Sequence, residues 1–294
     1  MKKTALVTGG AGFIGSHLCQ KLLDNNFEVI SLDNYFTGSK ENEIAGVKYV
    51  DGHTKDIEKL IEENKIEKIN IVYHLGEYSR VAESINEPEV VLDLNLTGTF
   101  NVLEFCRKRN IKIIYAGSST KYAHGTIDDS VDGADLSPYT WSKAINTDLV
   151  EKYGKWYGLE YAIFYFYNVY GERERAGKYG TVVQIFLEKY LNNEPLLMSL
   201  PGTQTRIYTH INDAVEAIYL VGENGTGDGY GISAEESFSV IELIELFPGA
   251  KVETRPPRAT SRKESIVNNE KVKALGWKQK HNLKDYISKK ISKK

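Results

Sequence analysis

The chain has 294 residues, of which 37 are basic and 40 are acidic, so its formal net charge is −3. A nucleic-acid-binding protein needs a positive excess on at least one face, and this balance predicts no nucleic-acid partner. The longest uninterrupted apolar run covers only residues 161–167, whereas a helix that spans a membrane needs about 20 apolar residues. We therefore expect no membrane partner either.

Cysteine and histidine usage narrows the location and the chemistry. Cys19 and Cys106 fall in segments with helical patterns that lie far apart in the sequence, which favours reduced, buried thiols in a cytoplasmic protein. No basic stretch followed by an apolar stretch opens the chain, as it does in a secretory leader. The six histidines are scattered without close partners, so no metal site is predicted.

Strand-like and helix-like segments alternate regularly through the first half of the chain. Apolar strands are expected at residues 3–8, 27–32, 47–50, 69–74, 111–116 and 159–166, with helices at 13–26, 57–64, 90–109 and 139–157. In the third of these helices, Leu94, Thr97, Asn101 and Phe105 are predicted to lie on one stripe.

This alternation is typical of a doubly wound α/β fold with a parallel, Rossmann-type sheet. After about residue 168 the rhythm ends, and glycines cluster over residues 222–231. We expect residues 1–167 to form one domain that holds the Rossmann-type sheet. Residues 168–294 would form mainly a smaller C-terminal lobe, and chain crossings between the two parts remain open.

A glycine-rich turn ends the first expected strand. Gly10, Gly12 and Gly15 satisfy Gly-x-Gly-x-x-Gly, and Gly9, Gly12 and Gly15 satisfy Gly-x-x-Gly-x-x-Gly. Such glycines permit a tight turn and let the backbone approach a pyrophosphate, which then lies on the positive N-terminus of the helix. A glycine turn alone can also be purely structural.

An acidic residue in the right place supports the cofactor interpretation. Asp33 ends the second expected strand, 18 residues after Gly15, where a carboxylate accepts hydrogen bonds from the adenosine ribose. The next residues, Asn34 and Tyr35, are not basic, which favours NAD over NADP. Asp56 could reach the adenine, or could instead cap the helix that begins at Ile57.

Together these motifs and several later ones resemble the extended short-chain dehydrogenase/reductase family, and within it the nucleotide-sugar 4-epimerase branch. The later motifs are Asn95-Leu96-Thr97-Gly98-Thr99, Ser118 before Tyr122, Tyr139-x-x-x-Lys143, residues 167–173 and residues 205–213. The resemblance runs from residue 4 to about residue 277. It implies cofactor contacts from Gly9, Gly12, Phe13, Ile14, Gly15, Asp33, Asn34, Asp56, Ile57, Leu75, Gly76, Asn95, Tyr139 and Lys143.

The resemblance assigns the catalytic base to Tyr139. Lys143 follows four residues later and therefore shares one helix face with it, where an ammonium favours the phenolate. Pro138 suits the first position of a helix and would place Tyr139 in the first turn. By resemblance, Tyr139 takes the proton of a sugar hydroxyl and Lys143 also holds the nicotinamide ribose.

Ser118 is the third catalytic candidate, with Ser119 as its alternative, although a serine pair after a strand can also be a turn or helix cap. Sugar 4,6-dehydratases of the family carry Asp-Glu directly after this hydroxyl. Here the two positions are Ser119 and Thr120, so dehydration lacks its acid and base.

Two places depart from the family pattern. Glu77 and Arg80 stand where the family usually has small or uncharged residues near the nicotinamide and the sugar. Tyr165 stands where the family often has an arginine. These changes leave the cofactor motifs intact and leave the identity of the sugar open.

The resemblance also implies a site for the nucleotide diphosphate. Arginine is the side chain best suited to phosphate, and Arg206 matches a family diphosphate ligand, with Arg258 or Arg262 as a second. Solvated loop arginines remain the alternative. The substrate-binding residues expected are Ser118, Ser119, Asn168, Arg206, Arg258 and Arg262.

The expected function is therefore NAD-dependent epimerisation at C4 of a nucleotide-diphosphate sugar, a UDP-hexose or UDP-N-acetylhexosamine, through a 4-keto intermediate. A 4-dehydrogenase or 4-reductase with net redox change is the first alternative. A non-catalytic dinucleotide-binding regulator is the second. The helices expected at residues 90–109 and 139–157 resemble the pair through which the family forms homodimers.

Overall fold

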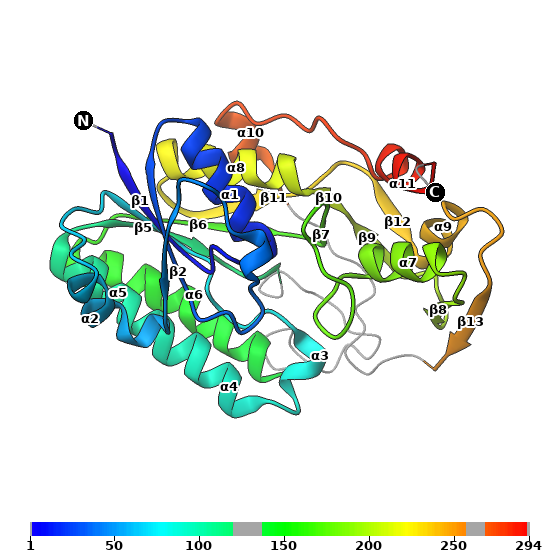
Figure 1. Ribbon diagram of the computed structural model, residues 1–294, viewed down its shortest axis with the longest axis horizontal. Coiled ribbons are helices and arrows are strands. Elements are labelled where there is room, and N and C mark those ends of the chain that lie inside the picture. The colour runs from blue at the N-terminus through cyan, green and yellow to red at the C-terminus, as the bar shows by residue number, and fades with distance from the viewer. Residues whose placement is uncertain (1, 120–136, 257–267, 293–294) are drawn as a thin grey trace.

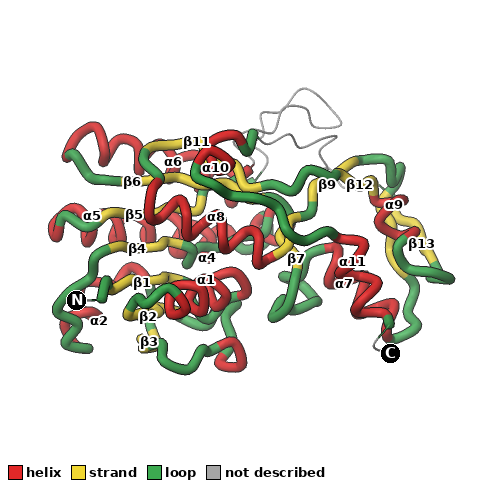
Figure 2. Tube along the Cα trace, turned by 90° about the horizontal axis from the view of Figure 1, so that it is seen from above, coloured by secondary structure: helices red, strands yellow, loops and turns green. Residues whose placement is uncertain are grey.

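A computed structural model describes residues 2–119, 137–256 and 268–292 of the chain. Its largest element is a seven-stranded sheet in the order β11-β6-β5-β4-β1-β2-β3, in which every neighbouring pair is parallel (Figure 2). The strands are β1 (Thr4–Thr8), β2 (Glu28–Asp33), β3 (Lys48–Asp51), β4 (Ile71–His74), β5 (Lys112–Ala116), β6 (Tyr161–Phe166) and β11 (Gly227–Ile232). The predicted Rossmann-type fold is confirmed.

Helices cover both faces of this sheet (Figure 1). One face packs against α1 (Phe13–Asp24), α8 (Ile211–Asn224) and α10 (Glu270–Ala274), through buried side chains such as Leu18, Ile218 and Val272. The other face packs against α2 (Ile57–Glu63), α5 (Gly98–Arg109) and α6 (Pro138–Tyr157), through Ile61, Val102 and Val150. Burial on both faces explains why the central strands are apolar throughout.

The expected helix over residues 90–109 consists of three helical segments in direct succession. It begins with α4 (Pro88–Leu92), widens into a π turn, η3 (Asp93–Thr97), and continues as α5. Of the predicted stripe, Leu94 and Phe105 are buried, whereas Thr97 is exposed and Asn101 is half-buried. Gly98 and Val102 are buried one position further along the chain, after the wider turn.

The chain enters a second lobe after β6 (Figure 1). A separate apolar cluster, which includes Phe186, Phe247 and Tyr286, forms its core. Its helices are α7 (Val182–Leu191), α9 (Val240–Glu245) and α11 (Leu283–Ile291). Its strand pairs are β7 (Val169–Tyr170) with β10 (Thr209–His210), β8 (Leu196–Ser199) with β13 (Val252–Arg255), and β9 (Thr205–Ile207) with β12 (Ser237–Ser239).

The chain returns to the first sheet between these elements, because β11 pairs with β6 and α8 packs on α1. Cys19 and Cys106 are free and buried, which confirms the expected buried thiols, and burial raises the pKa of Cys19 to about 12. Within the described residues, no helix combines the length and apolar character needed to cross a membrane.

Candidate active site

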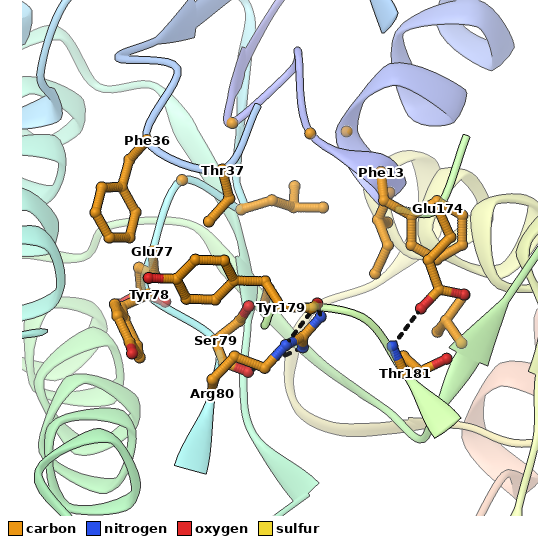
Figure 3. A pocket seen from close by; sticks show the side chains of 18 of the residues that line it. Phe13, Phe36, Thr37, Glu77, Tyr78, Ser79, Arg80, Glu174, Tyr179 and Thr181 are labelled. Atoms are coloured by element: carbon orange, nitrogen blue, oxygen red, sulfur yellow. Dashed lines mark hydrogen bonds between the residues drawn. The ribbon is translucent and has the colours of Figure 1, made fainter. Parts of the chain in front are cut away.

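A cavity of about 910 Å³ lies at the carboxyl ends of the central strands. Residues that follow β1, β2, β4, β5 and β6 line it, as do residues from the second lobe. The carboxyl edge of a parallel sheet is where ligands bind in open α/β folds. Figure 3 shows part of this cavity, with Phe13, Glu77 and Arg80 on its walls.

The glycine turn beside the cavity has no room for side chains at Gly9 and Gly15. Gly9 has a φ of +74°, and a Cβ atom there would lie 3.0 Å from the backbone of Gly76. A Cβ atom at Gly15 would collide with the carbonyl oxygen of Gly9. Among the described residues no side chain caps α1, which begins at Phe13 beside the cavity. This cradle fits a pyrophosphate on the helix N-terminus.

Asp33 lines the cavity at the end of β2. Its two carboxylate oxygens accept hydrogen bonds from the backbone amides of Ala11 and Tyr35, each at 2.8 Å. Burial raises the pKa of Asp33, and the two amides act against that rise. A carboxylate held in this way retains lone pairs for ribose hydroxyls, so the residues present fit a dinucleotide with an unmodified ribose.

Most of the expected cofactor residues line the cavity. They are Gly9, Gly12, Phe13, Ile14, Gly15, Asp33, Asn34, Leu75, Gly76, Tyr139 and Lys143. Three others lie outside its lining. Asp56 precedes α2 without capping it through its side chain, and Ile57 is buried in the core. Asn95 accepts a hydrogen bond from the amide of Tyr78 and donates one to Ser142, and thus supports the wall from behind.

The three catalytic candidates all line the cavity. Pro138 begins α6 and Ser137 caps it, which confirms Tyr139 in the first turn. The phenol of Tyr139 donates to Ser118 Oγ at 3.3 Å. Lys143, one turn further along α6, is 4 % exposed, and its ammonium contacts Glu77 Oε2 and the carbonyl of Ala116.

Glu77 is a buried carboxylate in this wall, with 4 % of its side chain exposed. Burial acts to raise its pKa, but the Lys143 ammonium and further hydrogen bonds outweigh burial and hold the pKa below its ordinary value. The sequence marked Glu77 as a departure from the family, but it did not reveal this ion pair. A charged residue directly after a buried strand was the only available signal.

Three of the predicted substrate residues line the cavity, Ser119 after β5 and Asn168 and Arg206 after β6. Burial lowers the pKa of Arg206. Asn168 adopts a left-handed φ of 31° and donates to the carbonyl of Ile207 at 2.9 Å. The other two predicted substrate residues, Arg258 and Arg262, lie outside the described residues.

Sequence reasoning missed an aromatic wall. The rings of Phe36, Tyr78 and Tyr179 lie with centroids 5.9 to 6.3 Å apart (Figure 3). Phe36 follows Asp33 at the end of β2, so its proximity to the strand end could have marked it. Tyr179 belongs to the segment between β7 and α7, which no local pattern connects to the cavity.

His210 and Asp213 have structural roles. His210 caps α8, which begins at Ile211, and its Nδ1 accepts a hydrogen bond from the amide of Asn212. Asp213 accepts from the amides of Lys280 and His281. Neither residue lines the cavity.

Comparisons with known proteins agree with this geometry. The model of the NAD-dependent epimerase/dehydratase family matches residues 5–232. A Methanocaldococcus jannaschii protein named "Putative UDP-glucose 4-epimerase" is 34% identical over 297 residues, which cover 98% of this chain and 97% of that protein. A UDP-N-acetyl-alpha-D-glucosaminuronate decarboxylase of Bacillus cytotoxicus is 32% identical over 262 residues, covering 83% and 79%.

A solved structure has a similar fold over almost the whole chain. UDP-glucose 4-epimerase from Thermotoga maritima, determined with UDP-glucose, superimposes with a TM-score of 0.90 and 28% identity, covering 98% of this chain and 97% of that one. The expected cofactor is confirmed, since the family is NAD-dependent and the cavity fits a dinucleotide. The chain belongs to the NAD-dependent epimerase/dehydratase family and is an enzyme of the extended short-chain dehydrogenase/reductase type.

Proposed function

We propose that the protein epimerises a nucleotide-diphosphate sugar at C4, with a UDP-hexose or UDP-N-acetylhexosamine as substrate, and with Ser118, Tyr139 and Lys143 as catalytic residues. The observation that carries this proposal is the Tyr139–Ser118 hydrogen bond, in the same cavity as the glycine turn and Asp33. A dinucleotide that lies on the glycine turn and reaches Lys143 would bring its nicotinamide to this phenol.

Each residue has a defined task in the proposed reaction. Tyr139 takes the proton of the 4-hydroxyl, while Ser118 donates a hydrogen bond to the reacting oxygen. NAD, when bound, would supply reversible hydride transfer at C4, and the 4-keto sugar would rotate in the cavity so that the hydride returns to its opposite face. Tyr139 then returns the proton, so no net oxidation remains. Asn168 and Arg206, with Arg258 and Arg262, would hold the diphosphate.

Relatives with other reactions define the competing outcomes. A 4-ketone in a sugar with a C6 carboxylate is a β-keto acid, which loses CO₂ readily, so the decarboxylase among the relatives begins from comparable chemistry. A 4-dehydrogenase would release the ketone without returning the hydride. Dehydration is disfavoured because residues 119 and 120 carry no carboxylate.

A substrate panel separates these reactions. The purified protein is incubated with UDP-, dTDP-, GDP- and CDP-sugars and with UDP-hexuronic acids, while NMR follows the sugar and absorbance follows NADH. A 4-epimer without lasting NADH supports the proposal. A lasting 4-ketone with NADH, or release of CO₂, contradicts it and selects the alternative. Tyr139→Phe should abolish turnover, whereas Tyr190→Phe, whose phenol lies in the second lobe against Pro248, should not.

We also propose a cytoplasmic homodimer that associates through α5 and α6. Phe100 on α5 and Trp141 and Ile145 on α6 are 41 to 49 % exposed. Trp141 and Ile145 lie four residues apart and share one face of α6, and exposed apolar side chains that lie together are typical of an interface. Light scattering should give twice the 33.2 kDa chain mass. Phe100→Glu should yield a folded monomer, and a wild-type monomer would contradict the proposal.

A further inference from the structure

The carboxylate of Glu77 lies behind the catalytic lysine in a complete set of donors. Its Oε2 accepts from the Lys143 ammonium. Its Oε1 is within hydrogen-bond distance of Thr99 Oγ1 (2.7 Å), Tyr115 Oη (3.1 Å) and Asn146 Nδ2 (2.7 Å). Resting on the proposed function, we propose that Glu77 is a positioning residue that holds the Lys143 ammonium in place and balances its charge beside Tyr139.

The donor set selects an ionised carboxylate at this position. Lys143 and Asn146 can only donate here, and the hydroxyls of Thr99 and Tyr115 both turn their hydrogens towards Oε1. A protonated acid would direct its own hydrogen at one of these donors. The donors come from α5, β5 and α6, so the carboxylate joins three elements at the point where Lys143 enters the cavity.

The same network reaches the cofactor turn through His74. Thr8 Oγ1 accepts from the amides of Leu75 (3.1 Å) and Gly76 (2.9 Å), so its hydrogen is directed to His74 Nδ1 at 2.7 Å. His74 Nε2 then donates to Thr99 at 2.9 Å, and Thr99 donates to Glu77. Burial lowers the pKa of His74 to about 4, which agrees with a neutral ring in this tautomer.

The ion pair between Glu77 and Lys143 reduces the positive charge that acts on the Tyr139 phenol. An isolated lysine would favour the Tyr139 phenolate by its full charge, whereas Lys143 shares its charge with a carboxylate in direct contact. The other ionisable groups around this cluster in the described part of the chain are His74, Tyr78, Arg80, Tyr115 and Tyr179, and through Arg80 also Glu83 and Glu174. Among these, Arg80 supplies a second positive charge that interacts with Tyr139.

Removal of the negative charge therefore has a definite direction. In the proposed reaction Tyr139 accepts a proton from the sugar hydroxyl, so its phenol must first be deprotonated. A negative charge nearby opposes that deprotonation, and its removal in Glu77→Gln favours the deprotonated phenol. The acid limb of the pH–rate profile must then move towards lower pH.

Glu77→Gln tests this inference, because the amide keeps the size of the side chain but not its charge. The acid limb of kcat/KM should move down by about one pH unit or more. The control is Asp213→Asn, which removes a buried, hydrogen-bonded carboxylate outside the cavity. The control should lower the melting temperature without moving the limb. An unmoved limb in Glu77→Gln would overturn the proposal.

A thermal cycle tests the pairing without reference to any reaction. Lys143→Met leaves the Glu77 carboxylate buried without its cation, and should lower the melting temperature by about 5 °C or more. Glu77→Gln combined with Lys143→Met should recover part of that loss. A double variant no more stable than Lys143→Met would overturn the pairing. Failure of the substrate panel, by contrast, overturns the proposed function and with it the catalytic role, while the cycle still reports on the pair.

Discussion

Arg80 donates from Nε to the backbone carbonyl of Tyr179 at 2.8 Å, and so joins the loop after β4 to the segment that precedes α7 (Figure 3). The same segment is attached at two further places. Arg175 contacts Ser39 and Glu41, and Lys178 contacts Glu87. The residues between β7 and α7 are thus fastened to the sheet domain beside the cofactor cavity, and their attachment should govern how long a ligand stays there.

Loss of the Arg80 bonds should weaken cofactor retention. Arg80→Met removes half-buried, charge-assisted bonds to the Tyr179 carbonyl, so we expect the dissociation constant of NADH to rise about tenfold. Arg175→Met removes an exposed ion pair, and should change it less than about threefold. NADH fluorescence during titration and release measures both. Equal effects of the two variants would contradict the central role of Arg80.

The two serines after β5 should differ sharply. Ser118 accepts from the Tyr139 phenol, so Ser118→Ala should lower kcat by about 10- to 1,000-fold while nucleotide-sugar affinity changes little. Ser119→Ala should alter KM more than kcat, because Ser119 lines the cavity as a predicted substrate contact. Steady-state kinetics on the substrate found by the panel separates the two. The reverse pattern would assign the catalytic hydroxyl to Ser119.

Local patterns were sufficient to predict the first six strands, the glycine turn, Asp33 and the place of Tyr139 on its helix. Each of these depends on a periodicity or a short motif whose physical cause lies within a few residues. The remaining strand of the large sheet, β11, was not predicted, because its local sequence does not favour a strand. Its sequence holds Gly227, Gly229 and Gly231, which disfavour a strand, and pairing with β6 imposes the extended backbone.

The candidate site shows the same division. The sequence marked Glu77 and Arg80 as unusual, but their partners lie far away along the chain. Tyr115 and Asn146 bond Glu77 from 38 and 69 residues away, and Tyr179 bonds Arg80 from 99 residues away. Such contacts arise when β5 takes its place in the sheet and when α6 and the second lobe pack against it. No local sequence pattern encodes them.

Cofactor choice should depend on Asp33. Asp33→Asn keeps an acceptor near the amides of Ala11 and Tyr35 but removes the charge that repels a 2′-phosphate. We expect the ratio of NADP to NAD affinity to rise at least about tenfold, mainly because NADP binds better. Competitive titration with both cofactors measures the ratio. An unchanged ratio would mean that Asp33 does not face the ribose hydroxyls.

The pH dependence of stability should reflect histidines that are buried without charge. Burial lowers the pKa of His74 and of His210 to about 4, while the unfolded chain titrates near 6.5. Between pH 4 and pH 6.5 the unfolded state binds more protons than the folded state. The contribution of these histidines to the free energy of unfolding is therefore complete above pH 6.5 and is lost as the pH falls towards 4. His74 alone accounts for about 3 kcal/mol at the lower limit.

A carboxylate with a lowered pKa loses its contribution at lower pH than these histidines. Glu104, whose pKa the bonds from Arg107 lower to about 2, contributes stability that is fully present above about pH 4.5 and is lost as the pH falls from there to 2. Urea unfolding at several pH values between 7.5 and 4.5 should therefore show a slope that His74→Asn reduces by about one proton. An unchanged slope in that variant would mean that His74 binds a proton in the folded state, and the neutral chain from Thr8 to Glu77 would then be incorrect.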